Sequence, residues 1–363
     1  MTAVETTLEE ASRDYTLGGP EAQRAAERGL VGAGWYRTPL DRKTLKALMQ
    51  RSDGPAIRDT ALWLGLLLGT GALGVATWGT LWAVPVFAVY GLLYATAADS
   101  RWHEAGHGTA FRTRWMNDAV YHIASFLLVA NPVTTWWSHS RHHTDTIIVG
   151  LDPEIPAARP PNLWLIAVNF FGIVAAPRNY GTMIRLAAGR LTRDEAAHVP
   201  ESERPKAILA ARIHLAIHGA AWIAAAWNWS FLPVMLIGLP RFYGIWLSFV
   251  MGVPQHLGLA EDVLDHRLNS RTILMNPVLR FFYSNMNYHI EHHMFPMVPY
   301  HRLRELHEAI RHDCPPPYPS VLHAWAEMIP CVLRQRRDPR HFVRPTLPPG
   351  AGHLPQEAPH AAE

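Results

Sequence analysis

The feature that most restricts how this chain can fold is a long stretch without a charged residue, which runs from residue 60 to residue 98. Its length is sufficient for two helical membrane crossings of about 20 residues each. The sequence Thr77-Trp78-Gly79-Thr80 in its middle offers a turn. We therefore predict two transmembrane helices, at about 58–78 and 81–98, that form a hairpin.

A second apolar region is interrupted by a single charge. Residues 213–240 and 242–260 contain no Asp, Glu, Lys or Arg, and Arg241 stands between them. We predict helices at about 207–227 and 231–251. In that register Arg241 lies in the membrane, which is costly unless the charge finds a polar partner or prolines break the helix.

Basic residues indicate how the hairpins are oriented. The positive-inside rule places the basic flank of the first hairpin in the cytoplasm, and this flank contains Arg37, Arg42, Lys43, Lys46, Arg51 and Arg58. The segments 100–206 and 252–343 carry most of the remaining charge. We expect an all-α integral membrane protein with two transmembrane hairpins, about four spans, and a cytoplasmic helical cap. This topology places both termini and the site on the cytoplasmic side, as in a multi-pass protein of the cell inner membrane.

Composition defines the ends of the domain and excludes several classes of protein. Residues 1–35 are polar and rich in Ala, Glu and Gly, and residues 344–363 are rich in Pro, so we expect both to be flexible around one domain at 36–343. Only 17% of residues are charged, and the formal charge is +3, without the basic runs that nucleic-acid binding requires. Two cysteines cannot form a disulfide scaffold.

Three histidine clusters lie in the segments that the predicted topology places on the cytoplasmic side. In each cluster the spacing places the rings on one face of a helix. The clusters are His103 and His107, then His139, His142 and His143, then His289, His292 and His293. His103 follows the end of the first predicted hairpin closely and His256 follows the end of the second, so both hairpins bring histidines to the same side of the membrane. Imidazole is a common metal ligand, so this convergence predicts a metal centre.

The number of clustered histidines indicates two metal ions. Eight imidazoles exceed the four ligands of a structural zinc site. An all-imidazole set suits iron, zinc or copper, and the ligand type alone does not choose among them. Hydrolysis at zinc would leave five histidines unused, whereas two irons that activate O₂ would use all eight.

The phrases HEAGHGTAF, HSRHHTDT and NYHIEHHMFP, in this order, carry one H-x-x-x-H and two H-x-x-H-H boxes. The chain thereby resembles the membrane-bound fatty acid desaturase/hydroxylase superfamily. The resemblance implies an oxidoreductase with two non-haem irons that uses O₂ and external electrons to desaturate an aliphatic chain, most simply a fatty acyl group. In this family a ninth histidine often lies between the second and third boxes, and His256 is similar to it.

The resemblance also implies a separate electron donor, such as a ferredoxin, a rubredoxin or a reductase, and contact with membrane lipid. Arginines after the third box could attract an acidic donor; they are Arg302, Arg304, Arg311, Arg334, Arg336 and Arg337. Glu104 and Glu291 lie inside the boxes and could accept the free N–H of a ligating imidazole. Asp152, just after the second box, could orient a box or the head of the substrate.

Other functions are compatible with parts of the pattern. A hydroxylase, or a desaturase of a small amino-acid-like metabolite, would use the same scaffold. His103-Glu104-x-x-His107 is also the pattern of zinc metalloproteases, in which the glutamate is a general base. That class leaves both H-x-x-H-H boxes unexplained.

Overall fold

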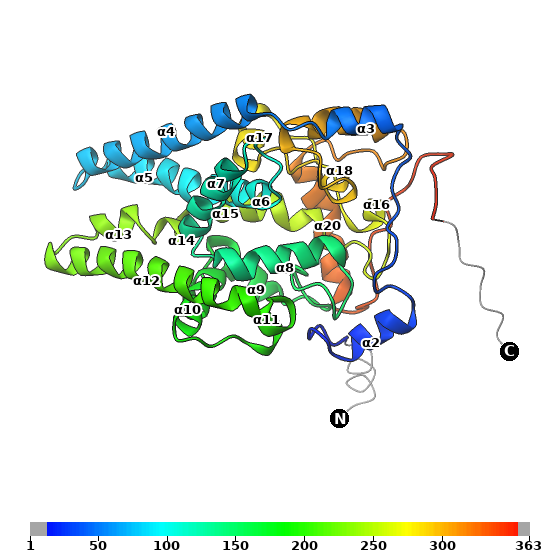
Figure 1. Ribbon diagram of the computed structural model, residues 1–363, viewed down its shortest axis with the longest axis horizontal. Helices are drawn as coiled ribbons and strands as arrows, with labels where there is room; N and C mark the ends of the chain where they lie inside the picture. The colour runs from blue at the N-terminus through cyan, green and yellow to red at the C-terminus, as the bar shows by residue number, and fades with distance from the viewer. Residues whose placement is uncertain (1–12, 355–363) are drawn as a thin grey trace.

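The structure, a computed structural model, describes residues 13–354 (Figure 1). In this part of the chain the fold is helical and contains no β-strand. Two isolated β-bridges join Thr272 to Tyr288 and Ile273 to Tyr318. The all-helical class predicted from the sequence is therefore confirmed for the described residues.

Both helices of the first predicted hairpin are present. Helix α4 spans Asp53–Thr77, and after a turn with Gly79 at φ 84° the chain returns through α5, Ala83–Gly91. A π-helical turn, Leu92–Thr96, joins α5 to α6, Ala97–Gly106. Both limbs are long and apolar enough to cross a membrane. Because the second limb continues without a break, it carries the first histidine box directly beyond the apolar stretch.

The second predicted hairpin is present only in its first limb. Helix α12, Arg204–Trp227, is the third helix in the described residues that is long and apolar enough to span a membrane. The predicted helix at 231–251 is divided into α13, Leu232–Leu236, α14, Pro240–Tyr243, and α15, Trp246–Gly252. The structure thus differs from the four continuous helices that we expected.

The break in this limb follows from its glycine and prolines. Gly238 adopts φ 100°, a conformation that an L side chain rarely takes, and Pro240 starts α14 without a backbone N–H. The break buries Arg241, whose side chain is within the protein and donates from Nε to the Leu128 carbonyl oxygen at 3.0 Å. The sequence allowed a polar partner or a broken helix for this arginine, and the structure has both.

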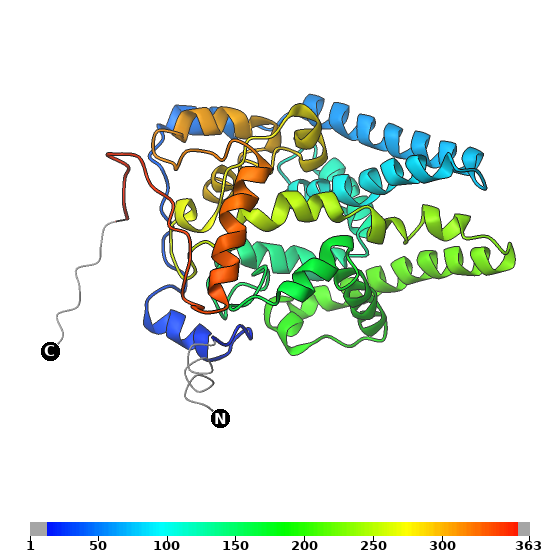
Figure 2. The same ribbon diagram turned by 180° about the vertical axis from the view of Figure 1, so that it is seen from behind.

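The two apolar pairs, α4 with α5 and α12 with α13, project in the same direction from the rest of the protein (Figures 1 and 2). The remaining helices gather mainly at the other end. They are α2, Pro20–Glu27; α3, Arg42–Leu48; α7, Arg114–Leu127; α8, Pro132–Thr144; α9, Leu163–Val168; α10, Ala175–Ala187; α11, Arg193–His198; α16, His266–Asn269; α17, Pro277–Tyr283; α18, His289–Met294; α19, Leu303–Ile310; and α20, Val321–Gln335.

Residues 1–12 and 355–363, at the predicted flexible ends, lie outside the described residues. The described part of the N-terminal segment includes α2, in which Ala25 packs against Ile148. Near the other end, the Gly352 amide donates to Asp313 at 2.8 Å, and the Gly352 carbonyl accepts from Arg267 at 2.7 Å.

The broken limb meets the first hairpin through a close backbone contact between Gly244, which follows α14, and Gly91, the last residue of α5. A Cβ atom built on Gly244 would lie 1.9 Å from the carbonyl oxygen of Gly91. Thr96 adds a hydrogen bond from its hydroxyl to the Gly244 carbonyl at 2.7 Å. Glycine at position 244 therefore allows the broken limb to approach the first hairpin.

We expect Gly244→Ala to destabilise the protein by about 3 kcal/mol or more, because the new methyl group can be accommodated only if the two backbones separate. The measurement is thermal unfolding of the detergent-solubilised protein. Gly219→Ala in α12 is the matched control, since a Cβ there meets nothing within 4 Å. Equal unfolding temperatures for the two variants would contradict this account of the contact.

Candidate metal centre

Four elements deliver nine histidines to one buried region. Helices α6, α8 and α18 carry the three boxes, and the short 3₁₀ turn Val253–Gln255 presents His256 directly after it. The nine residues are His103, His107, His139, His142, His143, His256, His289, His292 and His293. The structure thus brings together every histidine that the sequence proposed as a ligand.

Five of these histidines form a first group, in which each offers a ring nitrogen within 4.8 Å of the others. They are His103, His107, His139, His143 and His292. The Nε2 atom of His139 lies 3.2 Å from that of His107 and 3.1 Å from that of His143. The Nε2 atoms of His143 and His292 are 3.3 Å apart, which links the second box to the third.

His142, His256 and His293 form a second group under the same 4.8 Å criterion. His289 belongs beside this group, because its Nε2 atom lies 2.8 Å from that of His256 and 3.1 Å from that of His293. His256, the one candidate outside a box, therefore makes direct ring contacts with the third box.

The helical spacing explains how two boxes supply two groups. Residues i and i+4 differ by about 40° around a helix, whereas i+3 lies about 60° to the other side. In α8 the i, i+4 pair, His139 and His143, faces the first group and His142 faces the second. In α18 the assignment is reversed, because His289 and His293 face the second group and His292 faces the first.

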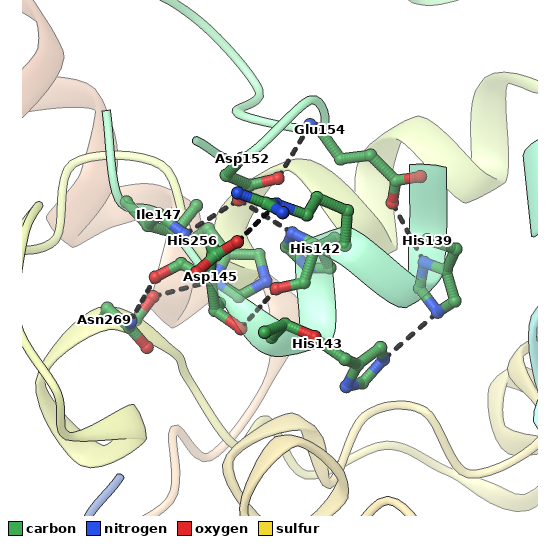
Figure 3. Close-up of polar contacts among 12 residues, drawn as sticks. His139, His142, His143, Asp145, Ile147, Asp152, Glu154, His256 and Asn269 are labelled. Carbon is green, nitrogen blue, oxygen red and sulfur yellow. Dashed lines mark hydrogen bonds and ion pairs between the residues drawn. The ribbon is translucent and has the colours of Figure 1, made fainter. Parts of the chain in front are cut away.

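Acceptors fix the tautomers of three rings (Figure 3). The Nδ1 atom of His139 lies 2.9 Å from Glu154, and that of His142 lies 2.8 Å from Asp152. His256 Nδ1 lies 2.8 Å from the Asn269 carbonyl oxygen. A ring that donates from Nδ1 carries its lone pair on Nε2, the atom that points into the groups.

The loop after the second box holds Asp152 in place (Figure 3). Its carboxylate accepts from the backbone amide of Ile147 at 2.7 Å and from that of Glu154 at 2.8 Å. The carboxylate is fully buried. Asp152 can therefore orient His142, as the sequence analysis suggested.

The donor set fits a cation at each group. The Nε2 atom of His103 is buried and has no hydrogen-bond partner, although its Nδ1 atom lies 3.0 Å from Glu104. Burial, followed by the neighbouring imidazoles, lowers the pKa of His143 and that of His293 well below the usual range. These two rings are therefore neutral at pH 7, as metal ligation requires. Converging lone pairs without donors are stabilised by a bound cation, so both groups could hold a metal ion.

The two glutamates inside the boxes have different surroundings. Glu104 is 1% exposed, and its carboxylate lies 3.0 Å from Nδ1 of His103 and 3.9 Å from Nδ1 of His292. Glu291 instead contacts the Thr272 hydroxyl and His307 Nδ1, each at 2.5 Å. Glu104 therefore touches ring nitrogens of the first group, whereas Glu291 contacts residues outside the boxes.

Sequence reasoning missed several neighbours of the histidines. Glu154, which contacts His139, could have been noticed because it lies two residues after Asp152 in the same loop. His266 is buried, with its ring centroid 5.2 Å from that of His293. Its sequence context gives no signal, because the contact depends on how α16 packs against α18.

We expect Asp152→Asn to lower turnover by about 10- to 100-fold, because it removes the charge that orients His142 and supports its basicity. Turnover and metal content are measured together. Asp194→Asn, on the exposed surface of α11, is the matched control. If both variants keep the wild-type rate and metal content, Asp152 has no such role.

The fold and the site together define a helical protein with candidate membrane spans and two histidine groups suited to metal ions. The description "Fatty acid desaturase" belongs to the family that matches residues 76–325, more than half of the chain. The chain therefore belongs to the fatty acid desaturase family, as the sequence motifs indicated, and it is an oxidoreductase of this type.

Two curated relatives come from Arabidopsis thaliana. Delta(8)-fatty-acid desaturase 2 is 23% identical over 340 residues, which cover 82% of this chain and 73% of that protein. Delta(8)-fatty-acid desaturase 1 is 21% identical over 343 residues, which cover 82% of this chain and 72% of that protein.

Proposed function

We propose that this protein is an O₂-dependent oxidoreductase with two non-haem irons that desaturates the aliphatic chain of a fatty acyl substrate. The observation that carries the proposal is the sorting of nine buried or partly buried histidines into two adjoining groups. When bound, two irons supply the oxidising power needed to remove hydrogen from an unactivated C–H bond. The names of the two Arabidopsis relatives support a fatty acyl substrate.

The residues of the chain have defined tasks in this proposal. His103, His107, His139, His143 and His292 would hold one iron, and His142, His256, His289 and His293 would hold the other. Glu104, Asp152 and Glu154 orient three of these rings by accepting hydrogen bonds from their Nδ1–H groups. Burial of the rings excludes bulk water, which protects a reactive site from side reactions.

The contacts of Glu104 disfavour a zinc metalloprotease. A general base of that class must be free to take a proton from water, but Glu104 is buried and its carboxylate contacts His103. The two histidines of that motif also share their group with three others. We therefore place the protein in the oxidative class.

Electron balance requires a separate donor. Reduction of O₂ to two waters takes four electrons, and forming one C=C bond supplies only two of them. The other two, with two protons, come from outside the substrate. We propose a ferredoxin, a rubredoxin or a reductase as their source, and a multi-pass topology in the cell inner membrane with the site and both termini cytoplasmic.

The test is mass spectrometry of lipids and small metabolites from cells that express the wild type or the His292→Ala variant. We expect acyl chains that are two hydrogens lighter only with the wild type. Acyl chains that gain one oxygen would identify a hydroxylase instead. A change confined to a small polar metabolite would refute the fatty acyl substrate.

A further inference from the structure

The protein carries two arginine-rich surface patches with the same balance of charge. The first, here called the α19 groove, has a volume of about 670 Å³, and its lining includes Arg280, Arg304, Arg311, Glu308, Tyr288 and His307. The second, here called the α20 patch, is lined by Arg334, Arg336, Arg337 and Asp338. Each has three arginines and one carboxylate, so net charge alone does not distinguish them.

The α19 groove presents arginines that are available to a partner. The ion pair between Arg311 and Glu308, at 3.3 Å, is largely exposed and is therefore weak. Arg304 is exposed, and neither it nor Arg280 forms an ion pair within 4 Å among residues 13–354. A partner that supplied carboxylates could pair with these guanidinium groups.

The lining of the α19 groove leads directly to the metal centre. His307 is 7% exposed, and its Nδ1 atom lies 2.5 Å from Glu291, the residue that precedes His292. Tyr288, whose ring centroid is 5.3 Å from that of His307, precedes His289. The groove thus reaches His292 of the first group through one hydrogen bond and one peptide unit, and His289, beside the second group, through one peptide unit.

The α20 patch lacks this connection. Its side chains extend from the end of α20 and the turn that follows, where Gln335 donates to the His341 carbonyl oxygen at 2.8 Å. Among the described hydrogen bonds, none links this patch to a box histidine or to the carboxylates beside one. Of the two basic surfaces, the α19 groove alone combines charge with a short route to the centre.

We propose that the α19 groove is the docking site of the electron donor, a small soluble redox protein with an acidic surface. This inference rests on the proposed function, which requires electrons from outside. The cysteines of the chain cannot replace such a donor, because Cys314 and Cys331 are each buried and are too few for an iron–sulfur cluster. Complementary charge would steer the donor towards the groove and raise its rate of association.

The first readout is binding, measured by thermophoresis on the full-length protein in detergent. The probes are a plant-type [2Fe–2S] ferredoxin and a rubredoxin, both acidic. We expect the wild type to bind at least one of them, with an affinity that falls as salt increases. Arg304→Glu/Arg311→Glu should weaken that binding at least about tenfold, whereas Arg334→Glu/Arg337→Glu, with the same change in charge, should weaken it less than about threefold.

The second readout compares turnover driven by the bound donor with turnover driven by reduced methyl viologen, a small reductant that needs no protein docking. The ratio of the two rates should fall at least about tenfold in the groove variant and stay unchanged in the α20 variant. Suppose that neither the wild type nor any variant turns over with methyl viologen, while the groove variant still binds the donor more weakly than the α20 variant does. The proposed function is then wrong, but the docking site is retained.

Three results would overturn the inference. The wild type binds neither probe, or both double variants lose the same amount of affinity for the probe, or the α20 variant loses more affinity than the groove variant. Vesicles that contain phosphatidylglycerol test the competing occupant. If the groove variant loses vesicle binding but keeps its affinity for the donor, the groove contacts anionic lipid and the proposal is wrong.

Discussion

His143→Ala is expected to abolish turnover, with a loss of at least about a thousandfold, and to remove iron from the first group. The reason is the central position of this ring, which lies 3.1 Å from His139 and 3.3 Å from His292 through its Nε2 atom. Its loss therefore removes the link between the second and third boxes. Turnover and iron content of the purified variant are the measurements.

The control for this variant is His214→Ala. His214 is also buried, at 7% exposure, and its Nδ1 atom has no partner, but it lies on α12 outside both histidine groups. We expect the control to keep its iron and most of its activity. Full turnover by His143→Ala, or equal iron loss in both variants, would contradict the assignment of His143 as a ligand.

The second large effect is expected at His256. This ring contacts His289 at 2.8 Å, and burial and the neighbouring His142 lower its pKa to about 3, so it is neutral and able to bind a metal. We expect His256→Ala to empty the second group, to leave one iron in the first, and to lower turnover by at least about a hundredfold.

Iron counting separates this outcome from a structural role. If His256 only supported packing, its replacement would weaken the fold and lower the iron content of both groups together. His256→Gln, which keeps a polar side chain of similar reach, should lose the same single iron. Two irons per chain and a near-normal rate in His256→Gln would remove His256 from the centre.

Much of the fold could be predicted because charge-free stretches and histidine spacing are local properties of the sequence. The two limbs of the first hairpin and the first limb of the second follow from apolar length alone. Gly238 and Pro240 make a break in the limb after α12 possible, but three short helices could not be predicted, because their packing depends on how Gly244 meets Gly91 and how Arg241 reaches Leu128. These contacts join segments far apart in the chain.

The histidines of the centre could be proposed from the sequence, but their partition between two groups could not. The boxes in α8 and α18 have identical spacing, yet they face the groups in opposite senses, which depends on how the helices are rotated against each other. The contact between His256 and the carbonyl oxygen of Asn269 could not be predicted either, since every residue has a backbone carbonyl. The position of Glu154, two residues after Asp152, was a signal, but the sequence does not distinguish an orienting carboxylate from an exposed one.

The most direct test of the central claim, a centre with two irons, is metal analysis of the purified protein by mass spectrometry. Iron and zinc are counted per chain, and turnover is measured on the same sample after chelation and reloading with each metal. We predict about two irons per chain, no stoichiometric zinc, and activity restored by iron alone. A single zinc per chain that restores activity would contradict the account.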